Sequence, residues 1–429
     1  MKILIISQYW QPENGVPQRR WKWLSDVLVD TGHEVVAIAP PPHYKRKVSM
    51  REWLLAEGLS FRFKVEEEPS GVRIFRSGFF PSGPSLTQRI WNQAWISMAM
   101  IVGLVLRAGP VRDYRPDVII GTVPALPTAL VTWFASRRLQ APYVIDLRDA
   151  WPALFEESAK WNQATGHPSL REKLLTKGPF QLLVATTKRV VNFALEKADG
   201  IVTTSSYLEE QLKQSARVPT AVVRNVFPSV LRSDQKRQSS VKGQLNVLYA
   251  GTLGRAQRLD NVIEAAKIAQ NQLGLDLAIR FVGDGDSWHN LNSRAQELSA
   301  PIQFEHQKPP EELTADLDWA DTALVHLTDW HSLEAAIPSK TYELMSNGIH
   351  ICAVVSGEAA EIVNRFQAGH VVKPNDPVGL AQLWVDLSQN PKLLEVPQSG
   401  AKWVAHEREV AAPAAFLKLL ETVYENNTR

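Results

Sequence analysis

The sequence IPSKTYELMSNG, near residue 340, contains two charged side chains that could bind a nucleotide. Pro338 and Ser339 are typical of a helix start, so Lys340 and Glu343 are predicted to share one face of that helix. A carboxylate there can accept hydrogen bonds from two vicinal ribose hydroxyls, while the ammonium meets a phosphate. The alternative is an ordinary surface ion pair. We favour the binding role because the pair follows a strand predicted to end at Leu327.

A loop with two glycines and an arginine follows the strand predicted at Leu245–Ala250, and it is suited to a diphosphate. Gly251 and Gly254 let the main chain approach a ligand closely, and Arg255 can offer a planar, bidentate fork. Taken alone, Arg255 is better explained as a solvated loop residue. Its neighbourhood in the sequence favours the binding role.

A second glycine loop, Gly283-Asp-Gly285, follows the strand predicted at Leu277–Val282. Such a turn can present main-chain amide and carbonyl groups to the edge of a nucleobase. For the side chain of Asp284 we favour a simpler role, which is to cap a helix that begins near Trp288.

The first predicted strand is followed by a loop that contains Gly15. A glycine there allows the main chain to approach a phosphate at the start of the next helix, where N–H groups point outward. The alternative is a glycine that only permits a turn. The loop is neither a dinucleotide fingerprint nor a P-loop, which argues against an NAD-dependent oxidoreductase.

Three side chains that could act on an acceptor follow the strand predicted at Tyr143–Leu147. Asp149 could orient or activate an acceptor hydroxyl, and the indole of Trp151 could pack against a sugar. The alternative is a structural ion pair between Arg148 and Asp149 beneath a packed tryptophan.

These motifs need a framework that brings strand ends together, and the sequence predicts one. Short apolar runs alternate with helical patterns, which indicates parallel sheets covered by helices on both faces. Ligands of such folds bind beyond the carboxyl ends of the strands. The strands are predicted at Lys2–Ser7, His33–Ala39, Val72–Arg76, Asp117–Thr122, Tyr143–Leu147, Gly200–Thr204, Ala221–Arg224, Leu245–Ala250, Leu277–Val282, Ile302–Glu305, Thr322–Leu327, His350–Val355 and His370–Val372.

A polar and basic stretch, Phe227–Gly243, divides the pattern and is predicted to be an interdomain linker. We therefore expect two Rossmann-like α/β domains that face a cleft, one at 1–235 and one at 243–410. The segment 411–429 is expected to form a C-terminal helix that can cross back to the first domain.

Composition bounds the class of protein. The 429 residues are 45% hydrophobic and 21% charged, with a net charge of +2, so nothing demands a nucleic-acid partner. Cys352 is the single cysteine, which excludes an intramolecular disulfide or a zinc site of several thiolates and fits a reducing cytoplasm. The longest apolar run, Ile96–Leu106, is too short to span a bilayer.

The segment Arg89–Arg107 combines tryptophans, methionines and aliphatic residues between two arginines. Trp91 and Trp95 could lie at a membrane interface or contact a lipid-carried acceptor, and Lys45–Lys47 adds a short basic cluster. The alternative, which we slightly favour, is a helix buried between the sheet and a neighbouring element.

Taken together, these segments resemble the family-4 retaining glycosyltransferases of GT-B fold over almost the whole chain. The likeness is closest to the bacterial subgroup that builds cell-surface polysaccharides and glycolipids, which includes amino-sugar transferases. The residues that carry it are Gly15, Gly32–Val35, Arg115–Val118, Arg148–Pro152, Ala250–Gln257, Gly283–Gly285, Pro338–Glu343 and Gly357–Glu361.

The resemblance implies that the second domain binds the donor and the first binds the acceptor. It implies Glu343 as the ribose ligand, Lys340 beside the diphosphate, and Arg255 with Lys340 as the groups that stabilise the leaving group. Asp149 would orient the acceptor. The remaining donor-binding residues that it implies are Gly15, Gly251, Thr252, Gly254, Gln257, Gly283, Asp284, Gly285, Gly357, Glu358, Ala359 and Ala360.

The resemblance also implies that no metal and no cofactor take part, and that the anomeric configuration is retained. The expected donor is UDP-linked, with an N-acetylamino sugar among the candidates. The expected acceptor is a glycan or a polyprenyl-linked saccharide, used by a cytoplasmic protein that can attach peripherally to the inner face of the plasma membrane.

The chain departs from the family pattern at several positions. The first of two glutamates usual in the family falls on Ala335, one residue from Glu334, and the usual arginine and lysine of the diphosphate loop fall on Thr252 and Gln257. Ala150 replaces a usual leucine. These departures keep two rival functions in view. One is a GT-B sugar-nucleotide epimerase, which needs no acceptor, and the other is a non-catalytic nucleotide-sugar-binding subunit.

Overall fold

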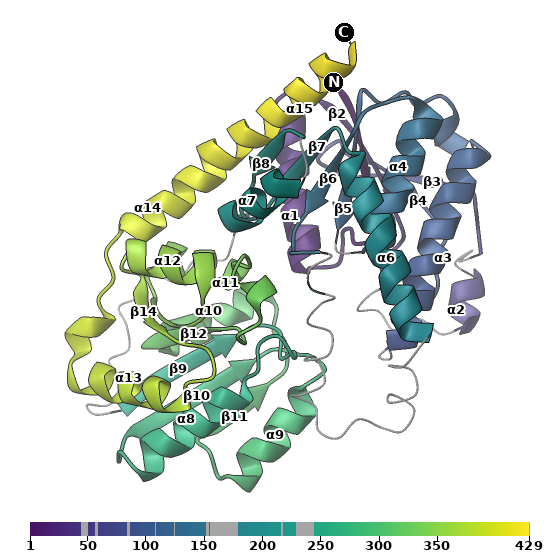
Figure 1. Ribbon diagram of the computed structural model, residues 1–429. Coiled ribbons are helices and arrows are strands. Elements are labelled where there is room, and N and C mark those ends of the chain that lie inside the picture. Colours follow the sequence, from purple (N-terminus) through teal and green to yellow (C-terminus); the bar gives the residue numbers. More distant parts are fainter. Residues whose placement is uncertain are drawn as a thin grey trace. The chain divides into compact units, whose positions relative to one another are not determined.

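The computed structural model of the chain divides into two compact units (Figure 1). Unit 1 contains the described residues up to Phe227 together with those from Glu409 onward, and unit 2 contains those from Pro228 to Arg408. The structure describes the whole chain except residues 44–49, 56–58, 84–85, 108, 124, 152–153, 155–178, 216–217, 229–243 and 429.

Unit 1 is built on an eight-stranded sheet of order β3-β4-β2-β1-β5-β6-β7-β8. All neighbouring strands pair in parallel except β3 and β4, which are antiparallel. The central strands are apolar on both faces because helices cover both sides of the sheet. The strands are β1 (Lys2–Ile6), β2 (Glu34–Ala39), β3 (Lys64–Glu67), β4 (Arg73–Arg76), β5 (Val118–Val123), β6 (Tyr143–Leu147), β7 (Gly200–Thr203) and β8 (Thr220–Val222).

The helices of unit 1 include one that follows unit 2 in the chain. Phe416, Leu419 and Val423 of this last helix, α15, are buried, and α15 contacts β5 to β8. The helices are α1 (Val16–Asp30), α2 (Met50–Leu55), α3 (Leu86–Val105), α4 (Pro127–Leu139), α6 (Pro179–Glu196), α7 (Ser206–Ser215) and α15 (Ala412–Thr428), with a 3-10 turn η1 (Gly109–Arg112).

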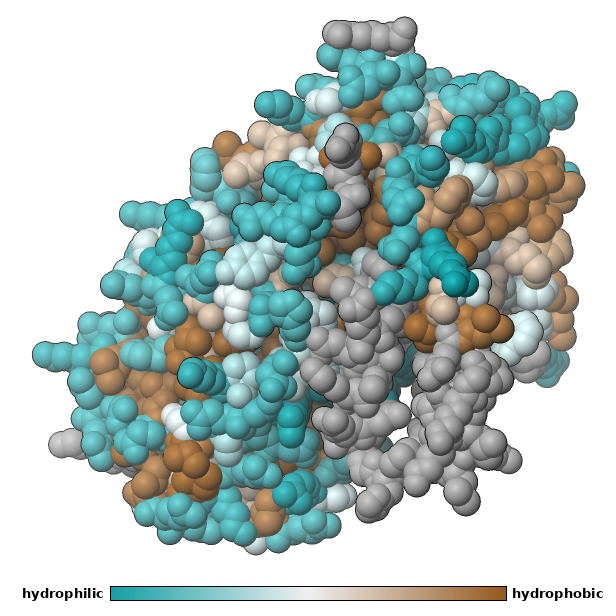
Figure 2. Space-filling model, in the orientation of Figure 1, coloured by the Kyte–Doolittle hydropathy of each residue, from teal (hydrophilic) through white to brown (hydrophobic). Residues whose placement is uncertain are grey.

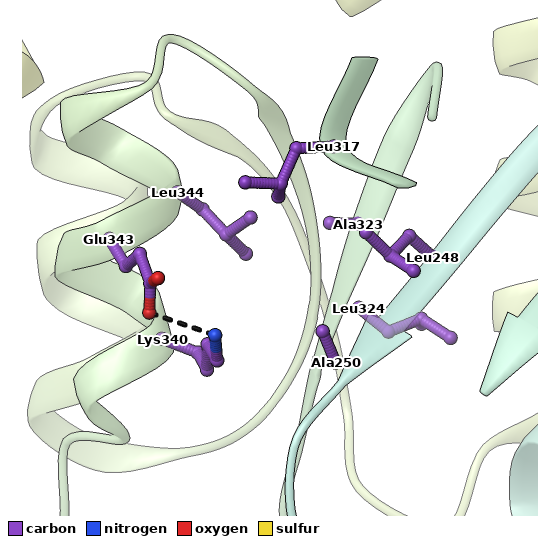
Figure 3. Close-up of a pocket in the computed structure, with 8 residues that line it drawn as sticks. All are labelled: Leu248, Ala250, Leu317, Ala323, Leu324, Lys340, Glu343 and Leu344. Carbon is purple, nitrogen blue, oxygen red and sulfur yellow. Dashed lines mark ion pairs between the residues drawn. The ribbon is translucent and has the colours of Figure 1, made fainter. Parts of the chain in front are cut away.

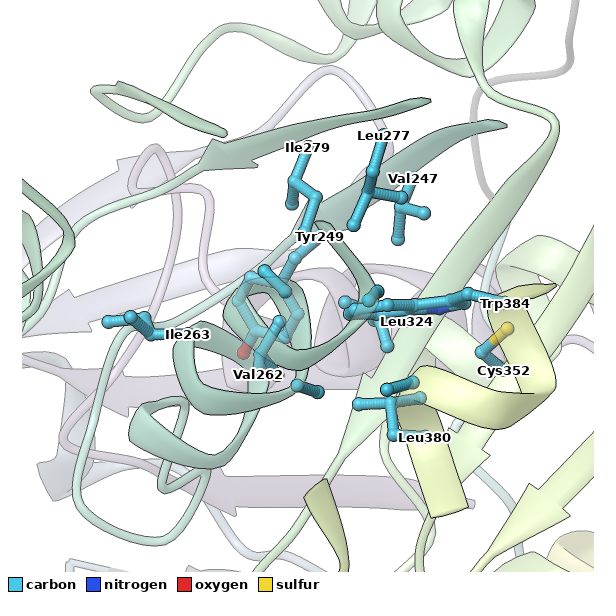
Figure 4. Close-up of a cluster of buried hydrophobic side chains, with 14 of the residues drawn as sticks. Val247, Tyr249, Val262, Ile263, Leu277, Ile279, Leu324, Cys352, Leu380 and Trp384 are labelled. Atoms are coloured by element: carbon cyan, nitrogen blue, oxygen red, sulfur yellow. The ribbon is translucent and has the colours of Figure 1, made fainter. Parts of the chain in front are cut away.

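Unit 2 is built on a six-stranded, wholly parallel sheet of order β11-β10-β9-β12-β13-β14. Its core includes Trp384, whose indole lies beside Leu324 and Cys352 (Figure 4). Burial raises the pKa of the Cys352 thiol to about 12, so this thiol stays protonated. The strands are β9 (Gln244–Ala250), β10 (Asp276–Val282), β11 (Ile302–Glu305), β12 (Thr322–His326), β13 (His350–Val354) and β14 (Gly369–Val372).

Helices connect the strands of unit 2 in the alternation that parallel pairing requires. They are α8 (Asp260–Asn271), α9 (Trp288–Glu297), α10 (Pro310–Trp319), α11 (Ser339–Ser346), α12 (Gly357–Arg365), α13 (Pro377–Gln389) and α14 (Ser399–His406), with 3-10 turns η3 (His331–Leu333) and η4 (Pro391–Leu394). The π turn η5 (Glu407–Ala411) contains the residues at which the chain passes from unit 2 to unit 1.

The predicted fold class, two parallel α/β domains, is confirmed. One strand was not predicted: β3 pairs antiparallel at the edge of the sheet, and its four exposed residues carry no apolar run. The strand expected at Ala221–Arg224 ends earlier, at Val222. The predicted boundaries at 235 and 243 and the cluster Lys45–Lys47 lie outside the described residues.

Within the described part of the chain, no helix combines the length and the apolar character needed to cross a bilayer. Apolar residues do gather at the surface of unit 1, over the region of α3 and α4 (Figure 2).

Candidate functional site

The predicted donor residues of unit 2 all follow strands of one parallel sheet. The loops after β9, β10, β12 and β13 therefore emerge at the same edge, the carboxyl edge, where α/β folds bind ligands. The structure brings these loops together, and main-chain hydrogen bonds link each of them to another.

The loop Gly251–Gln257, which we call the phosphate loop, is fixed from two sides. On the β10 side, Gly251 N–H donates to the Val282 carbonyl and Leu253 N–H donates to the Asp284 carbonyl, both at 3.0 Å. On the β12 side, the Thr328 N–H donates to the Ala256 carbonyl at 2.8 Å. Leu253 is fully buried, Thr252 is exposed, and the other five residues are half-buried. The loop is thus held by main-chain hydrogen bonds on both sides, and Thr252 is its one exposed residue.

Gly283 and Gly285 allow this loop to cross the loop after β10 at close range. A Cβ atom on Gly283 would lie 1.8 Å from the Gly251 carbonyl oxygen, and one on Gly285 would lie 2.2 Å from that of Leu253. These contacts are with main chain, which cannot move aside cheaply. The two glycines therefore shape the phosphate loop itself, a role that the sequence reasoning did not assign to them.

Asp284 does not cap α9, so the prediction for its side chain is wrong. Its carboxylate accepts hydrogen bonds from Nδ1 of His306 at 2.6 Å and from the Gln307 N–H at 3.0 Å. The residue before α9 is Ser287, and it makes no side-chain cap. Asp284 instead ties the loop after β10 to the loop after β11.

The predicted pair on α11 exists: Nζ of Lys340 lies 2.9 Å from Oε2 of Glu343 (Figure 3). Ser339 is the first helical residue and Pro338 precedes it, with no side-chain cap. Glu343 is 7% exposed, so this is not an ordinary surface pair. A buried carboxylate stabilised by one ammonium retains hydrogen-bonding capacity for a ligand.

A small apolar pocket lies behind this pair, between α11, α10 and strands β9 and β12. Its interior is about 10 Å³, room for roughly one water molecule. A nucleotide would thus lie outside the pocket rather than in it. The residues that line it are Leu248, Ala250, Leu317, Ala323, Leu324, Lys340, Glu343 and Leu344.

The start of α12 lies against Glu334. The Glu358 N–H donates to the Glu334 carbonyl at 2.9 Å, and Gly357 adopts φ +64°, where a Cβ would collide with the Glu334 main chain. The side chain of Ala359 is buried, so only its main chain could meet a ligand, whereas Ala360 is half-buried. Glu334 keeps its carboxylate half-exposed, while Ala335 is buried.

His326 and Asn261 form a contact of this site that the sequence reasoning missed. His326 ends β12 and is buried, and its Nε2 lies 3.1 Å from Nδ2 of Asn261 on α8. Burial, with a contribution from the charge of Arg258, lowers the pKa of His326 to about 4. The ring is therefore neutral at physiological pH, and Nε2 accepts the amide hydrogen. A histidine within an apolar strand pattern was the only signal.

In unit 1, Gly15 directly precedes α1 and its carbonyl accepts the first helical hydrogen bond, from Arg19. Its φ of −99° does not demand glycine, and a Cβ there would meet the end of the flexible Gln18 side chain. The start of α1 thus follows the carboxyl end of β1, and Pro17 in its first turn supplies no N–H group.

Arg148 and Asp149 follow β6 at the same edge of the unit 1 sheet. Nε of buried Arg148 donates to the Val123 carbonyl at 3.1 Å. Burial and the nearby Asp146 raise the pKa of Asp149, while Arg148 and the Trp151 indole act in the opposite direction. A carboxyl group with a raised pKa is suited to exchange a proton with a substrate hydroxyl.

Asp146, which the sequence reasoning missed, anchors this region. It accepts hydrogen bonds from Arg20 at 2.8 and 3.2 Å and from the Trp21 indole at 3.1 Å. Arg20 also donates to the Val223 carbonyl and to Asn225, so this fully buried guanidinium joins α1, β6 and the segment after β8. In the sequence, Asp146 is the single charged residue of an apolar strand, and this was the feature from which a buried ion pair could have been predicted.

Trp91 and Trp95 of α3 have different surroundings. Trp91 is exposed, whereas Trp95 packs against Trp53 and Phe61 with ring centroids 6.4 and 6.1 Å apart. Of the two tryptophans, Trp95 therefore takes part in the packing that the buried-helix alternative expects, and Trp91 does not.

Two sequence patterns of known families match the chain. The pattern described as "Glycosyl transferase 4-like domain" matches residues 15–226, and that described as "Glycosyl transferases group 1" matches residues 232–402. The fold and these two matches define the class of protein as a glycosyltransferase of GT-B fold. The chain belongs to the family-4 type of these enzymes.

Named relatives and solved structures agree with this assignment. The chain is 25% identical over 374 residues to the putative colanic acid biosynthesis glycosyl transferase WcaI of Escherichia coli K12, with 84% of each chain covered. It is 28% identical over 209 residues to the probable glycosyltransferase WbjE of Pseudomonas aeruginosa, covering 46% of this chain and 51% of that protein.

Solved structures share the fold at low identity. Sucrose-phosphate synthase from Thermosynechococcus elongatus matches with a TM-score of 0.65 at 15% identity, covering 99% of both chains. Anabaena HepE in complex with UDP and glucose matches with a TM-score of 0.61 at 15% identity, covering 100% of this chain and 99% of that one.

Proposed function

We propose that this glycosyltransferase moves a hexosyl or N-acetylhexosaminyl unit from a UDP-linked donor to a glycan or polyprenyl-linked acceptor, with retention of configuration and without a metal ion. The observation that carries the proposal is the buried, ion-paired carboxylate of Glu343 at the sheet edge that also holds the phosphate loop. A ribose on Glu343 would extend its diphosphate toward Lys340 and that loop.

The reaction of the donor would use the positive groups at the carboxyl edge of the unit 2 sheet. The bond between the anomeric carbon and the diphosphate oxygen breaks while the acceptor oxygen bonds to the same carbon from the same face. Arg255, Lys340 and the N–H groups of the phosphate loop stabilise the negative charge that develops on the leaving diphosphate. The acceptor proton passes to an oxygen of that diphosphate, which leaves protonated, so the step needs no base from the protein.

Asp149 is proposed to orient the acceptor hydroxyl, with Trp151 beside it. Its raised pKa supports a carboxyl group that hydrogen-bonds to a hydroxyl rather than one locked in an ion pair. The choice of UDP is supported by the HepE complexes, and the choice of a cell-surface polysaccharide pathway by the colanic acid relative. A lipid-linked acceptor would bring the enzyme to the inner face of the plasma membrane.

The first experiment is calorimetric titration of the full chain with UDP, GDP and ADP in the presence of EDTA. We expect selective UDP binding, reduced at least tenfold in Glu343→Ala because two ribose hydrogen bonds are lost. Glu264→Gln, which removes the exposed carboxylate of α8 that pairs with Arg294 of α9, serves as the control and should bind normally. Equal affinity for all three diphosphates, or an unaffected Glu343→Ala variant, would refute the ribose assignment.

Turnover tests the rest of the proposal. Asp149→Asn should lower the rate of sugar transfer at least tenfold while UDP affinity stays within twofold of the original. EDTA should leave the rate unchanged, and NMR of the fresh product should show the anomeric configuration of the donor. UDP-sugar conversion without acceptor would instead identify an epimerase, and UDP binding that never leads to UDP release would identify a binding subunit.

A further inference from the structure

Two of the buried polar groups at the carboxyl edge of the unit 1 sheet have no hydrogen-bond partner within the part of the chain that the structure describes. One is Nη2 of Arg148, which follows β6, and the other is Oε1 of Gln8, which follows β1. Arg148 is 7% exposed and Gln8 is 1% exposed. Buried polar groups of folded proteins are almost always hydrogen-bonded, so exceptions at the edge where α/β folds bind ligands point to a ligand.

Arg148 is a buried cation that is not in an ion pair. Its Nε donates to the Val123 carbonyl at 3.1 Å, which holds the side chain against the end of β5. Among the described residues, no carboxylate forms an ion pair with its guanidinium, so the structural pair with Asp149 that the sequence left open is not formed. The carboxylate of Asp146 is already used by Arg20 and by the indole of Trp21. A buried charge in this state is costly unless a ligand supplies its partner.

The groups around Arg148 leave its charge only partly compensated. Those that act on it are Asp146 of β6, Asp149 in the same segment, Arg20 of α1 and Tyr9 after β1. Arg20 and Asp146 neutralise each other, with Nη2 and Oδ1 2.8 Å apart. Burial raises the pKa of Asp149, so its carboxyl group loses its charge more readily than an exposed one would. One positive charge is thus left for a ligand.

The unpartnered atom of Gln8 is a hydrogen-bond acceptor, as its neighbours on α3 require. The Ser97 hydroxyl donates its hydrogen to the Gln93 carbonyl at 2.8 Å, so it accepts from Nε2 of Gln8, which lies 2.8 Å from it. The same nitrogen donates to the Gln93 carbonyl at 3.3 Å. Both contacts need the amide nitrogen, which leaves Oε1 to accept from a hydroxyl of a ligand.

An unpaired cation together with an unpaired acceptor is complementary to a molecule that carries a carboxylate and a hydroxyl. Strand β5 separates β1 from β6, so the two segments begin about 10 Å apart, a span that one sugar residue with its substituents can bridge. The half-buried ring of Tyr9, which stacks on His43, adds the aromatic surface that is typical of small-ligand sites. A single planar guanidinium matches one carboxylate in shape and charge, whereas a pyrophosphate would need further cations.

We propose that Arg148 binds a carboxylate of the acceptor, and that the sugar residue that receives the transferred unit is therefore a hexuronate. Asp149 follows Arg148 directly, so the carboxylate and the accepting hydroxyl belong to the same sugar residue. Gln8 accepts a hydrogen bond from another hydroxyl of that residue. Arg148 determines which acceptor is used and takes no part in the bond change. The inference rests on the proposed function, because it names the class of acceptor that Asp149 orients.

The test is a saturation-transfer NMR titration of the full chain, with UDP present. The probes are methyl hexuronides of gluco, galacto and manno configuration, the matching neutral methyl hexosides, and the matching hexose 1-phosphates. We expect at least one uronide to bind about tenfold or more tightly than its hexoside, because only the uronide makes a charge-assisted, bidentate contact. Its affinity should also exceed that of the corresponding hexose 1-phosphate.

Variants of Arg148 connect this preference to one side chain. Arg148→Gln should abolish the preference for the uronide, and Arg148→Lys should reduce it, because lysine keeps the charge but lacks the planar fork. Arg115→Gln, which removes an exposed arginine before β5 at the opposite edge of the sheet, is the matched control and should keep the full preference. Urea unfolding checks that each variant is folded, and the behaviour of the original chain and of Arg148→Lys decides the matter if Arg148→Gln does not fold.

Several outcomes would overturn the inference while the proposed function stands. They are equal binding of uronides and hexosides by the original chain, tighter binding of hexose 1-phosphates than of uronides, and an unchanged preference in folded Arg148→Gln. A loss of UDP affinity in Arg148→Gln would place the guanidinium at the donor and would overturn it as well. Absence of UDP binding by the original chain, with the uronide preference intact, would instead refute the proposed donor.

Discussion

His326 illustrates how a single buried side chain can set the position of the phosphate loop. The loop leads into α8, and Asn261 of α8 donates to the His326 ring that ends β12. Thr328, which follows β12, also donates its N–H to the Ala256 carbonyl in the phosphate loop. The loop and the start of α8 are therefore both hydrogen-bonded to the end of β12 and the residues after it. The neutral state of the ring is thus part of the geometry that presents the loop.

The lowered pKa of His326 predicts a specific loss of stability in acid. Between pH of about 6.5 and about 4 the unfolded chain binds a proton at this residue that the folded chain does not, so folding weakens as the pH falls. From neutral pH to about pH 5 this residue should cost about 2 kcal/mol of unfolding free energy. Urea unfolding of the original chain and of His326→Gln at both pH values gives the loss of unfolding free energy in each protein. The difference between the two losses is the contribution of His326.

Glutamine can still accept the Asn261 hydrogen bond but does not titrate in this range. We therefore expect the variant to fold at neutral pH and to lose less stability in acid than the original chain. Identical pH dependence of the two proteins would contradict a folded-state pKa near 4. Burial also lowers the pKa of His43, in unit 1, and the comparison cancels its contribution.

Contacts between residues close together in the sequence could be predicted, and contacts between residues of different elements could not. Lys340 and Glu343 are three residues apart on one helix, so their ion pair follows from helical geometry alone. The contacts of His326 with Asn261 and of Asp284 with His306 join residues from different elements, and no local pattern encodes them. The burial of Glu343, which separates a binding carboxylate from a surface pair, also depends on the packed neighbours.

At the scale of elements, the site depends on two loops that cross with almost no space between their main chains. The phosphate loop and the loop after β10 exchange hydrogen bonds because Gly283 and Gly285 carry no side chain. The sequence suggested that these glycines face a nucleobase. Their packing role could not be inferred, since it requires knowing that β9 and β10 are adjacent.

Gly283→Ala should therefore disturb the donor site from outside it. The added Cβ would lie 1.8 Å from the Gly251 carbonyl oxygen, and we expect a loss of about 1–3 kcal/mol in stability together with weaker UDP binding. Gly400→Ala is the matched control, because it lies in α14, outside the donor loops, and its Cβ would lie 3.0 Å from the movable end of Met345. Chemical unfolding and UDP titration of both variants provide the measurement; equal effects would argue against the crossing.

The strands themselves were the most predictable elements. Continuous apolar runs such as that of β1 are typical of strands buried on both faces, and the two parallel sheets follow from their alternation with helices. Strand β3 escaped prediction because an exposed edge strand has no such run. Pairing order also lies beyond local patterns, because it depends on which helices cover which face.

At the scale of the whole molecule, α15 belongs to a unit from which it is separated in sequence by all of unit 2. Phe416 is fully buried and meets the edge of Trp21, with ring centroids 6.3 Å apart, next to the network of Arg20 and Asp146. The helix thereby contributes to the core of the unit that carries Asp149.

Phe416→Ala should weaken unit 1 in particular. We expect a loss of about 3–5 kcal/mol, as for other large aromatic residues removed from a core. The matched control is Val410→Ala, which shortens an exposed side chain of the preceding π turn. Calorimetric scanning with and without UDP should show the transition of unit 1 lowered while the UDP-stabilised transition of unit 2 remains in place. A shift of the UDP-stabilised transition alone would contradict this division of the core.

The place of α15 in the chain also sets an order of events during synthesis. The ribosome finishes the strands of unit 1 at Val222 and makes Ala412 only after the whole of unit 2, a delay of roughly ten to forty seconds at typical elongation rates. For that interval, the side of β5 to β8 that α15 will cover lacks its partner. A chain released before its last helix would carry a complete unit 2 beside an unfinished unit 1, and it would be a natural target for chaperones and proteases.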